Sequence, residues 1–374
     1  MTLSGVGAAA YSLLLRADGS VVAAGNMPGG SPTPISGTAA SEITGASPAV
    51  AVVADAFYGT SFAVQSGGAT LGWGKVIDTT GVVNVSDLGV GPAPSSTQGS
   101  PTAVSQLSPT VEIKACDGYV LARHDDGTIW IMPGKIVEST TGQPTTVAAL
   151  QVTGLNPIQS LGEPGNGSVS AVSFPVIDSQ GNVNVVSIGT WSIQNNTTNI
   201  TVTATYTIAA VGGLPATSQV VCADNGGGPN CLALGTDNTV WAWGSRNDFG
   251  QIGNGTTVGQ VVPVQVTALQ GVKVTQVAVS SFNAYALADD GTVYAWGDNG
   301  YLGQPYTSAI NNLVPTQVPN LTGIVEIVAR GYDILARDNQ GKVWGWGLNS
   351  AGELGTGNTS QAVTPTQFLG ISLN

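Results

Sequence analysis

Charged side chains are scarce in this sequence. They make up 9% of its 374 residues, against about 25% in an average soluble domain. Ten lysines and arginines are spread singly along the chain, and 22 aspartates and glutamates bring the formal net charge to −12. Proteins that bind nucleic acid set clustered basic side chains against the phosphates. The sequence therefore argues against a nucleic-acid partner.

Long apolar runs, helical periodicity and catalytic sets are missing as well. No run of about 18 apolar residues could span a membrane, and no apolar period of 3.6 is sustained, so we expect few helices. His124 is the single histidine, and the patterns HExxH, GxSxG, GxxxxGKS/T and CxxC do not occur. Acidic pairs such as Asp125–Asp126 fall in predicted turns. We predict a protein that is not an enzyme and that holds no metal or cofactor.

Glycine, by contrast, is abundant at 52 residues, and much of it belongs to an internal repeat. The segment WAWGSRNDFGQIGNG at 241–255 has close relatives at 290–303 and 340–357. Each copy contains a turn, Val-aromatic-x-Trp-Gly, a polar loop and a Leu/Ile-Gly. Weaker copies upstream complete seven units, and a fixed period of this length is the mark of a repeat architecture. The turn residues, roughly 50 positions apart, are Gly19, Gly68, Gly127, Gly181, Asn238, Gly291 and Gly341.

The best copy indicates a blade of four antiparallel strands. Val274–Val279 and Ala284–Ala288 alternate like strands, and after an Asp-Gly turn Thr292–Trp296 forms a third. A Pro-x-x-aliphatic tag, as at Pro315–Val318, marks the fourth strand. Proline belongs on an edge strand because it has no N–H for the ladder. Closing such blades into a ring leaves only short protected edges.

We therefore expect an all-β fold, a seven-bladed β-propeller of four-stranded antiparallel blades that forms one domain over 1–374. The approximate blades are 1–47, 48–108, 109–163, 164–216, 217–272, 273–325 and 326–374. The second and fourth units carry insertions, Lys75–Ser100 and Ser192–Thr207. These are either contact arms or loop variation without consequence.

The template G-x-V-aromatic-x-W-G-x-N-x-x-G-x-L-G, followed by P-x-x-V, resembles the repeat of the regulator of chromosome condensation family, most sharply over 217–374. The resemblance implies a seven-bladed propeller and a structural role for the repeat glycines. Each Trp-Gly tryptophan ends a third strand, which predicts packing within the propeller and not contact with a ligand. The predicted structural residues are Trp73, Trp243, Gly244, Trp296, Gly297, Trp346 and Gly347.

Founding members of that family exchange guanine nucleotide on a small nuclear GTPase and bind chromatin through basic segments. This sequence has no basic N-terminal tail, and it lacks the histidine that those repeats place before the second strand. Guanine nucleotide exchange is therefore a remote alternative. The terse, low-charge repeats are more similar to short secreted bacterial members of the family, which include a protein inhibitor of β-lactamases.

Aromatic residues mark a candidate binding face. In a four-stranded blade the loops after the first and third strands emerge on one face, and the former surround the centre. Aromatic side chains placed on such loops in several blades would converge, and such residues dominate interface hot spots. The alternative is that each ring packs under its own blade. The predicted partner-binding residues are Phe57, Tyr58, Tyr119, Phe282 and Tyr332.

Cys222 and Cys231 flank the flexible loop ADNGGGPN. They form either a disulfide across a strand connection or two small buried residues.

Two classes of function remain beside nucleotide exchange. A structural or display propeller on a bacterial exterior or in a phage particle fits the low charge and implies a larger assembly. A secreted inhibitor or receptor-like binder fits the aromatic loops. Both require a protein partner, and we expect an extracellular or virion-surface location. No signal peptide is visible, so a cytoplasmic location stays open.

Overall fold

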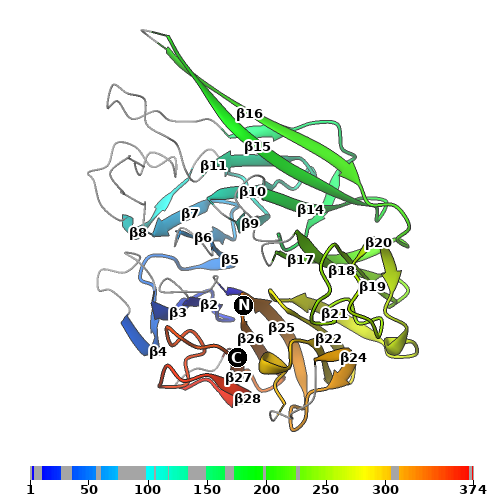
Figure 1. Ribbon diagram of the computed structural model, residues 1–374. Coiled ribbons are helices and arrows are strands. Elements are labelled where there is room, and N and C mark those ends of the chain that lie inside the picture. Colours follow the sequence, from blue (N-terminus) through cyan, green and yellow to red (C-terminus); the bar gives the residue numbers. More distant parts are fainter. Residues whose placement is uncertain are drawn as a thin grey trace.

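The computed structural model of the chain describes residues 2–3, 11–26, 36–55, 60–74, 98–104, 107–116, 118–133, 149–164, 172–196, 199–224, 228–304, 311–369 and 373. These ranges contain seven four-stranded antiparallel sheets, each built from four strands that are consecutive in the sequence. Figure 1 shows the sheets arranged like blades around a common centre. The all-β, seven-bladed propeller predicted from the repeat is confirmed.

The first strand of each blade lies nearest the centre, and the second lies beside it (Figure 1). The first strands are β1 (Thr2–Leu3), β5 (Ala49–Ala54), β9 (Glu112–Cys116), β13 (Ile158–Leu161), β17 (Thr217–Asp224), β21 (Val274–Val279) and β25 (Ile324–Arg330). The second strands are β2 (Tyr11–Leu15), β6 (Thr60–Gln65), β10 (Tyr119–Arg123), β14 (Val172–Asp178), β18 (Pro229–Gly235), β22 (Asn283–Ala288) and β26 (Asp333–Asp338).

The third and fourth strands complete each blade toward the rim. The third strands are β3 (Val21–Asn26), β7 (Thr70–Gly74), β11 (Ile129–Pro133), β15 (Val183–Asn196), β19 (Val240–Gly244), β23 (Val293–Gly297) and β27 (Val343–Gly347). The fourth strands are β4 (Ser36–Glu42), β8 (Gln98–Ala103), β12 (Leu150–Val152), β16 (Asn199–Ala210), β20 (Gln260–Gln265), β24 (Asn312–Gln317) and β28 (Ala362–Gln367). Among the described residues of the last three blades are two short 3-10 helices, η3 (Thr267–Leu269) and η4 (Asn299–Tyr301).

Local turn chemistry places the hairpin between the second and third strands. All seven predicted turn residues have a positive φ, from 66° at Asn238 to 82° at Gly291, a region open to glycine and tolerated by asparagine. Asp126 closes its turn by accepting the Thr128 N–H at 2.8 Å. Hydrogen bonds from the Thr128 hydroxyl and N–H hold the pKa of Asp126 below its usual range. This carboxylate is a turn-forming group.

The hydrophobic core is divided among the interfaces between neighbouring blades. Trp73 belongs to the cluster between the first and second blades, Trp296 to that between the fifth and sixth, and Trp346 to that between the sixth and seventh. All three side chains are fully buried. Each of these tryptophans therefore packs against the preceding blade.

The loop after the third strand of the preceding blade covers the indole. Trp296 Nε1 donates a hydrogen bond of 2.9 Å to the Gln251 carbonyl, and a Cβ added at Gly253 would lie 2.6 Å from the same nitrogen. Gly303 stands in the same relation to Trp346, at 3.0 Å. These glycines are required because the next blade's indole fills the space that a side chain would need.

The ring closes where the seventh blade packs on the first. Ala24 stands at the tryptophan position of the first blade, and it shares a buried cluster with Leu354 and Phe368 of the seventh. A Cβ added at Gly355 would overlap the Phe368 ring. Phe368 thus fills space at the closure that a tryptophan fills at other junctions.

The fourth blade departs most from the repeat. Its third and fourth strands, β15 and β16, have 14 and 12 residues, and their hairpin extends beyond the rim (Figure 1). β13, which lies inside the range expected for the third blade, is the first strand of this blade. Of the two insertions noted in the sequence, Ser192–Thr207 lies within this hairpin, whereas most of Lys75–Ser100 lies outside the described residues.

Cys222 of β17 and Cys231 of β18 are directly opposed in the ladder, and a disulfide joins them. The disulfide ties together the two strands that lead into and out of the loop after the first strand of the fifth blade.

Candidate binding face

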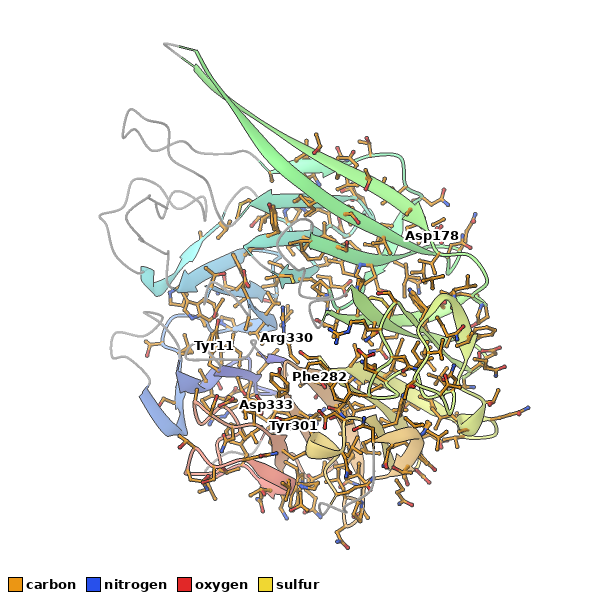
Figure 2. All side chains as sticks on the ribbon, viewed as in Figure 1. Tyr11, Asp178, Phe282, Tyr301, Arg330 and Asp333 are labelled. Atoms are coloured by element: carbon orange, nitrogen blue, oxygen red, sulfur yellow. A yellow bond between two sulfur atoms is a disulfide. The ribbon has the colours of Figure 1, made fainter. Side chains whose placement is uncertain are left out.

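Four aromatic rings from the last three blades form a continuous row, which we call the aromatic strip: Phe249, Phe282, Tyr332 and Tyr301. Neighbouring ring centroids are 4.8 Å apart for Phe249 and Phe282, 5.4 Å for Phe282 and Tyr332, and 5.3 Å for Tyr332 and Tyr301. All four rings are partly exposed. Figure 2 labels Phe282 and Tyr301 close together beside the centre of the propeller. Because these loops all follow first or third strands, the strip lies on one face.

Backbone hydrogen bonds hold the two central rings of the strip in place. The loops that carry Phe282 and Tyr332 are joined by the Ser281 N–H, which donates to the Gly331 carbonyl at 2.8 Å. Gly297 ends β23 with a φ of 115°, and a Cβ there would overlap the Phe282 carbonyl oxygen. Gly347 does the same for the Tyr332 carbonyl. The repeat glycines thus allow the aromatic loops to lie directly on the ends of the third strands.

The outer rings are carried by the loops after the third strands. In the fifth blade the buried Asn247 side chain donates to the Thr256 carbonyl at 2.8 Å and accepts the Ile252 N–H at 2.9 Å. In the sixth blade Asp298 caps η4, accepting the Gly300 N–H at 2.9 Å. The Asp298 N–H also donates to the Phe282 carbonyl at 3.1 Å. Asp298 therefore sits between Phe282 and Tyr301, and burial together with its carboxylate raises the pKa of Tyr301.

The structure brings together two of the five aromatic residues predicted from the sequence. Phe282 and Tyr332 are in contact, while Phe57 and Tyr58 lie outside the described residues. Tyr119 pairs with Pro133 at the register position where Asn283 pairs with Gly297. It consequently belongs to a strand, and it packs against the core cluster between the third and fourth blades.

The two outer members of the strip, Phe249 and Tyr301, were not predicted from the sequence. Both lie in the loop that the template describes only as polar. Their signal in the sequence is an aromatic residue directly beside a repeat glycine, Gly250 in one unit and Gly300 in the other.

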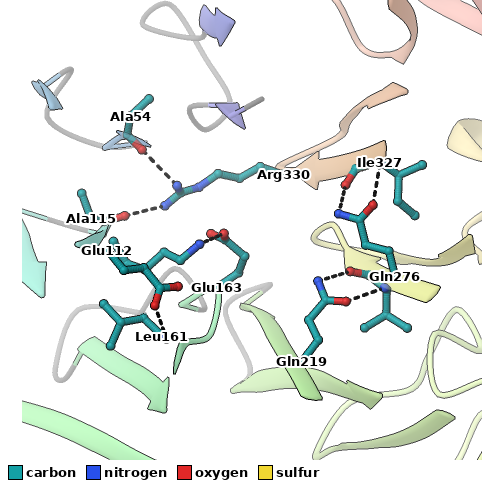
Figure 3. Close-up of polar contacts among 11 residues, drawn as sticks. Ala54, Glu112, Ala115, Leu161, Glu163, Gln219, Gln276, Ile327 and Arg330 are labelled. Atoms are coloured by element: carbon teal, nitrogen blue, oxygen red, sulfur yellow. Dashed lines mark hydrogen bonds and ion pairs between the residues drawn. The ribbon is translucent and has the colours of Figure 1, made fainter. Parts of the chain in front are cut away.

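Next to the strip, glutamine side chains link the first strands of successive blades around the centre. Gln219 makes two hydrogen bonds with the backbone of Val277, of 2.8 and 3.0 Å, and Gln276 makes two of 2.8 Å with that of Ile327. Figure 3 shows these paired contacts. These first strands belong to separate sheets, so no neighbouring strand satisfies the backbone N–H and C=O groups of Val277 and Ile327 on this side. The glutamine side-chain amides do so instead.

Charged side chains in the same region are held by backbone carbonyls and by an ion pair. Arg330 reaches across the centre to the carbonyls of Ala54 at 3.1 Å and Ala115 at 3.3 Å (Figure 3). Lys114 forms an ion pair with Glu163. Burial opposes the charge of Lys114, but the Glu163 and Glu112 carboxylates outweigh that effect and raise its pKa. These contacts tie the second, third, fourth and seventh blades together.

A cavity of about 80 Å³ lies between these first strands. Its lining includes Glu163, Gln276 and Arg330, and also Ser281 and Gly331, the residues that precede Phe282 and Tyr332. The centre of the propeller therefore adjoins the aromatic strip. The lining offers hydrogen-bonding and charged groups but no nucleophile set beside a base.

Asp333 is a buried acid at the start of β26. Its Oδ1 accepts the Asn349 N–H at 3.1 Å. Burial, together with the neighbouring Glu353 carboxyl, raises the pKa of Asp333 well above its usual range. Asparagine stands at the same register position in the two preceding blades, at Asn230 and Asn283.

Replacing Asp333 by asparagine is expected to stabilise the protein at pH 7 by about 1–2 kcal/mol. An acid whose pKa is raised by folding contributes stability below its unfolded pKa, near 4, that is lost as the pH rises toward the folded value. The variant should remove that loss, because the amide oxygen can still accept from Asn349. Urea unfolding at several pH values between 4 and 8 measures the difference in the free energy of unfolding between the variant and the wild type.

Asp178→Asn is the matched control for this experiment. Asp178 Oδ1 accepts the N–H groups of Gln180 and Asn182, both at 2.9 Å. Although burial works against it, these and the side-chain hydrogen bonds lower the pKa of Asp178. Asp178→Asn should therefore destabilise the protein at pH 7. An Asp333→Asn variant that loses stability at pH 7 as Asp178→Asn does would contradict the assignment.

Within the described ranges, no three His, Cys, Asp or Glu side chains are placed to hold a metal ion. None of the helices found there is long and apolar enough to cross a membrane. What the arrangement offers chemically is a contact surface of aromatic rings with carboxylates close by.

The fold and this face define a seven-bladed β-propeller with an aromatic contact surface on its loops. Residues 237–287, 290–334 and 340–373 match the model of the regulator of chromosome condensation (RCC1) repeat. The family predicted from the repeat template is confirmed, and the chain carries RCC1 repeats over these three segments.

Curated relatives match part of the chain. It is 33% identical to the human E3 ubiquitin-protein ligase HERC2 over 141 residues, which is 37% of this chain and 3% of that protein. Over 153 residues, 38% of this chain, it is 33% identical to the mitochondrial RCC1 domain-containing protein RUG3 of Arabidopsis thaliana. Over 156 residues, 41% of this chain, it is 29% identical to the Arabidopsis ultraviolet-B receptor UVR8. The chain spans about a third of the length of each plant protein.

Solved structures share the fold over most of the chain. Human WBSCR16 superposes with a TM-score of 0.65 and 20% identity, covering 90% of this chain and 88% of that one. Yeast RCC1 (Prp20), crystallised bound to Kap60, gives a TM-score of 0.62 and 18% identity, covering 83% and 72%. Propellers of this fold thus include one whose structure holds a bound protein.

Proposed function

We propose that this protein is a non-enzymatic propeller that binds another protein through the aromatic strip. The observation that carries the proposal is the convergence of four partly exposed rings from three blades on one face. Aromatic side chains supply large contact areas with few rotatable bonds, and they are enriched among interface hot spots. RCC1-fold relatives that bind proteins, such as Prp20 with Kap60, support this class of function.

The location belongs to the same proposal. A place on a bacterial exterior or in a phage particle is supported by the scarcity of charge and the abundance of glycine. Neighbouring genes test it, because virion genes beside this one would favour the phage particle, and housekeeping genes of the cytoplasm would count against both locations.

A secreted inhibitor or receptor-like binder is the second candidate, and the same strip favours it. An inhibitor would form a one-to-one complex with a soluble protein and block its activity, whereas a display propeller would be retained in a particle or on a cell surface. Fractionation of the native protein into soluble, surface and particle pools separates the two.

Phe282→Ala and Tyr332→Ala are each expected to weaken partner binding by at least about thirtyfold, the loss typical of a hot-spot aromatic. Asp126→Ala and Gln340→Ala, in turns between second and third strands at the opposite face, are the controls. Proteins that co-purify with each variant from the native cells are quantified against wild type. If the turn variants lose the partners and the aromatic variants keep them, the binding surface is the opposite face and not the aromatic strip.

A further inference from the structure

We propose that the partner presents a basic segment, whose arginine side chains stack on the exposed rings of the aromatic strip beside the Asp298 carboxylate. This inference rests on the proposed function, since it names the chemistry of the partner at the same face. A guanidinium is attracted to an aromatic face by the ring quadrupole and stacks on it as a flat group.

The ring geometry suits such a partner. The strip's rings are tilted against one another, at 56° for Phe249 and Phe282, 41° for Phe282 and Tyr332, and 47° for Tyr332 and Tyr301. Tilted rings turn their faces in different directions, so several faces can be offered to one flexible segment. Since each ring contacts its neighbour, the surface is already formed before a partner arrives, which limits the entropy lost on binding.

Charge around the strip favours a cation over an anion. Asp298 lies between Phe282 and Tyr301 and is partly exposed. Asp248, whose side chain is 59% exposed, directly precedes Phe249. Arg246 lies in the loop that carries Phe249, and its guanidinium is engaged by Asp248 at 2.9 Å.

The remaining described cations are either bound in the centre or lie at the opposite face. Arg330 is close to Tyr332 in the sequence, but its guanidinium donates to carbonyls across the centre. Lys114 and Arg330 are held in the centre by Glu163 and by the Ala54 and Ala115 carbonyls. The others lie where second strands end, in the turns that follow, or just before a first strand, at the opposite face: Arg16, Arg123, Lys273, Arg337 and Lys342. With a net charge of −12 over the whole chain, a basic partner is also steered toward the protein at low salt.

The probe is a fluorescent octapeptide of four Gly-Arg pairs, compared with a peptide in which citrulline replaces arginine. Citrulline keeps the shape and planarity of the side chain and removes its charge. Fluorescence anisotropy measures both dissociation constants at low and moderate salt. We expect the arginine peptide to bind at least about tenfold more tightly, the difference expected from a few cation–π and carboxylate contacts.

Three variants locate the binding. Phe282→Leu keeps an apolar side chain of similar size but removes the aromatic face, and it should weaken the arginine peptide about fivefold. Asp298→Asn keeps the cap of η4, because asparagine caps helices as aspartate does, and it should weaken binding by a similar factor. Asp290→Asn makes the same change of net charge in a turn at the opposite face, and it should change binding less than twofold.

Two results would overturn the inference. One is equal binding of the arginine and citrulline peptides, including no saturable binding of either. The other is a loss with Asp290→Asn as large as with Asp298→Asn, because net charge and not the strip would then attract the peptide. If the arginine peptide does not bind while Phe282→Ala still loses the natural partners, only this inference is wrong. If the arginine peptide binds at the strip but natural partners still bind the Phe282→Ala variant as they bind wild type, the proposed function is wrong.

Discussion

Replacing Trp296 by alanine is expected to lower the free energy of unfolding by about 3–5 kcal/mol, the range for large buried aromatic side chains. The indole is fully buried in the cluster between the fifth and sixth blades. Its removal opens a cavity between two blades, each of which is held by its own four-stranded sheet, and the cost grows with the volume that stays unfilled. It also leaves the Gln251 carbonyl without the indole N–H that donates to it at 2.9 Å. Guanidinium chloride unfolding followed by circular dichroism measures the loss.

Trp243→Ala is the matched control, since Trp243 holds the same position in the repeat but is only partly buried. Less apolar area is lost from it, so the cost should be clearly smaller than for Trp296. Two outcomes would show the structural assignment to be wrong: an equal or greater cost at Trp243, or a Trp296→Ala variant that stays stable and loses only partner binding.

The different environment of Trp243 also shows what the repeat could and could not predict. Trp296 and Trp346 are covered by the loops of the preceding blades, at Gly253 and Gly303. The blade before Trp243 has the long β15–β16 hairpin in place of that loop. In the sequence, Gly181 of the fourth unit is followed by NVNVVS, which contains no Trp-Gly. The sequence does not indicate that Trp243 of the next unit is left uncovered. That consequence depends on the packing of one blade against another.

Elements set by local chemistry were predictable. The turn residues follow from the few residue types that accept a positive φ, and all seven are found at the expected positions. The prolines of the fourth strands could be assigned to an edge for an equally local reason, and Pro263, Pro315 and Pro365 lie in outermost strands. At such positions the residue type alone predicts the local conformation, whatever the neighbours in space.

The aromatic strip was only half predictable, because it depends on register and on irregular loops. A shift of one residue moves an aromatic side chain from a loop into a strand, as for Tyr119, which takes the register position of Asn283 and packs against the core. Phe249 and Tyr301 come from loops of different length in their units. Their contact with Phe282 and Tyr332 depends on how those loops fold back over the face.

Gly297, the repeat glycine beside the Phe282 loop, is the site of the second large loss of stability that we expect. Gly297→Ala is expected to destabilise the protein by about 3 kcal/mol. At a φ of 115° an alanine is strained whatever its surroundings. Here the added Cβ would also overlap the Phe282 carbonyl oxygen and lie 2.9 Å from the Asn283 Cα. Because these are backbone atoms, relief requires the loop that carries Phe282 to move.

Gly213→Ala is the control that separates backbone strain at a positive φ from overlap of the added Cβ with other atoms. Gly213 has a φ of 85°, and a Cβ there would meet nothing within 4 Å, so this variant should lose only about 1 kcal/mol from the backbone conformation. The difference between the two losses measures the close approach of the Phe282 loop together with the added strain of the larger φ at Gly297. Gly297→Ala should in addition weaken binding of the arginine peptide at temperatures where the variant is still folded, and Gly213→Ala should not. Equal losses of stability for the two variants would mean that Phe282 is not held against the end of β23, and that the strip is not a preformed surface.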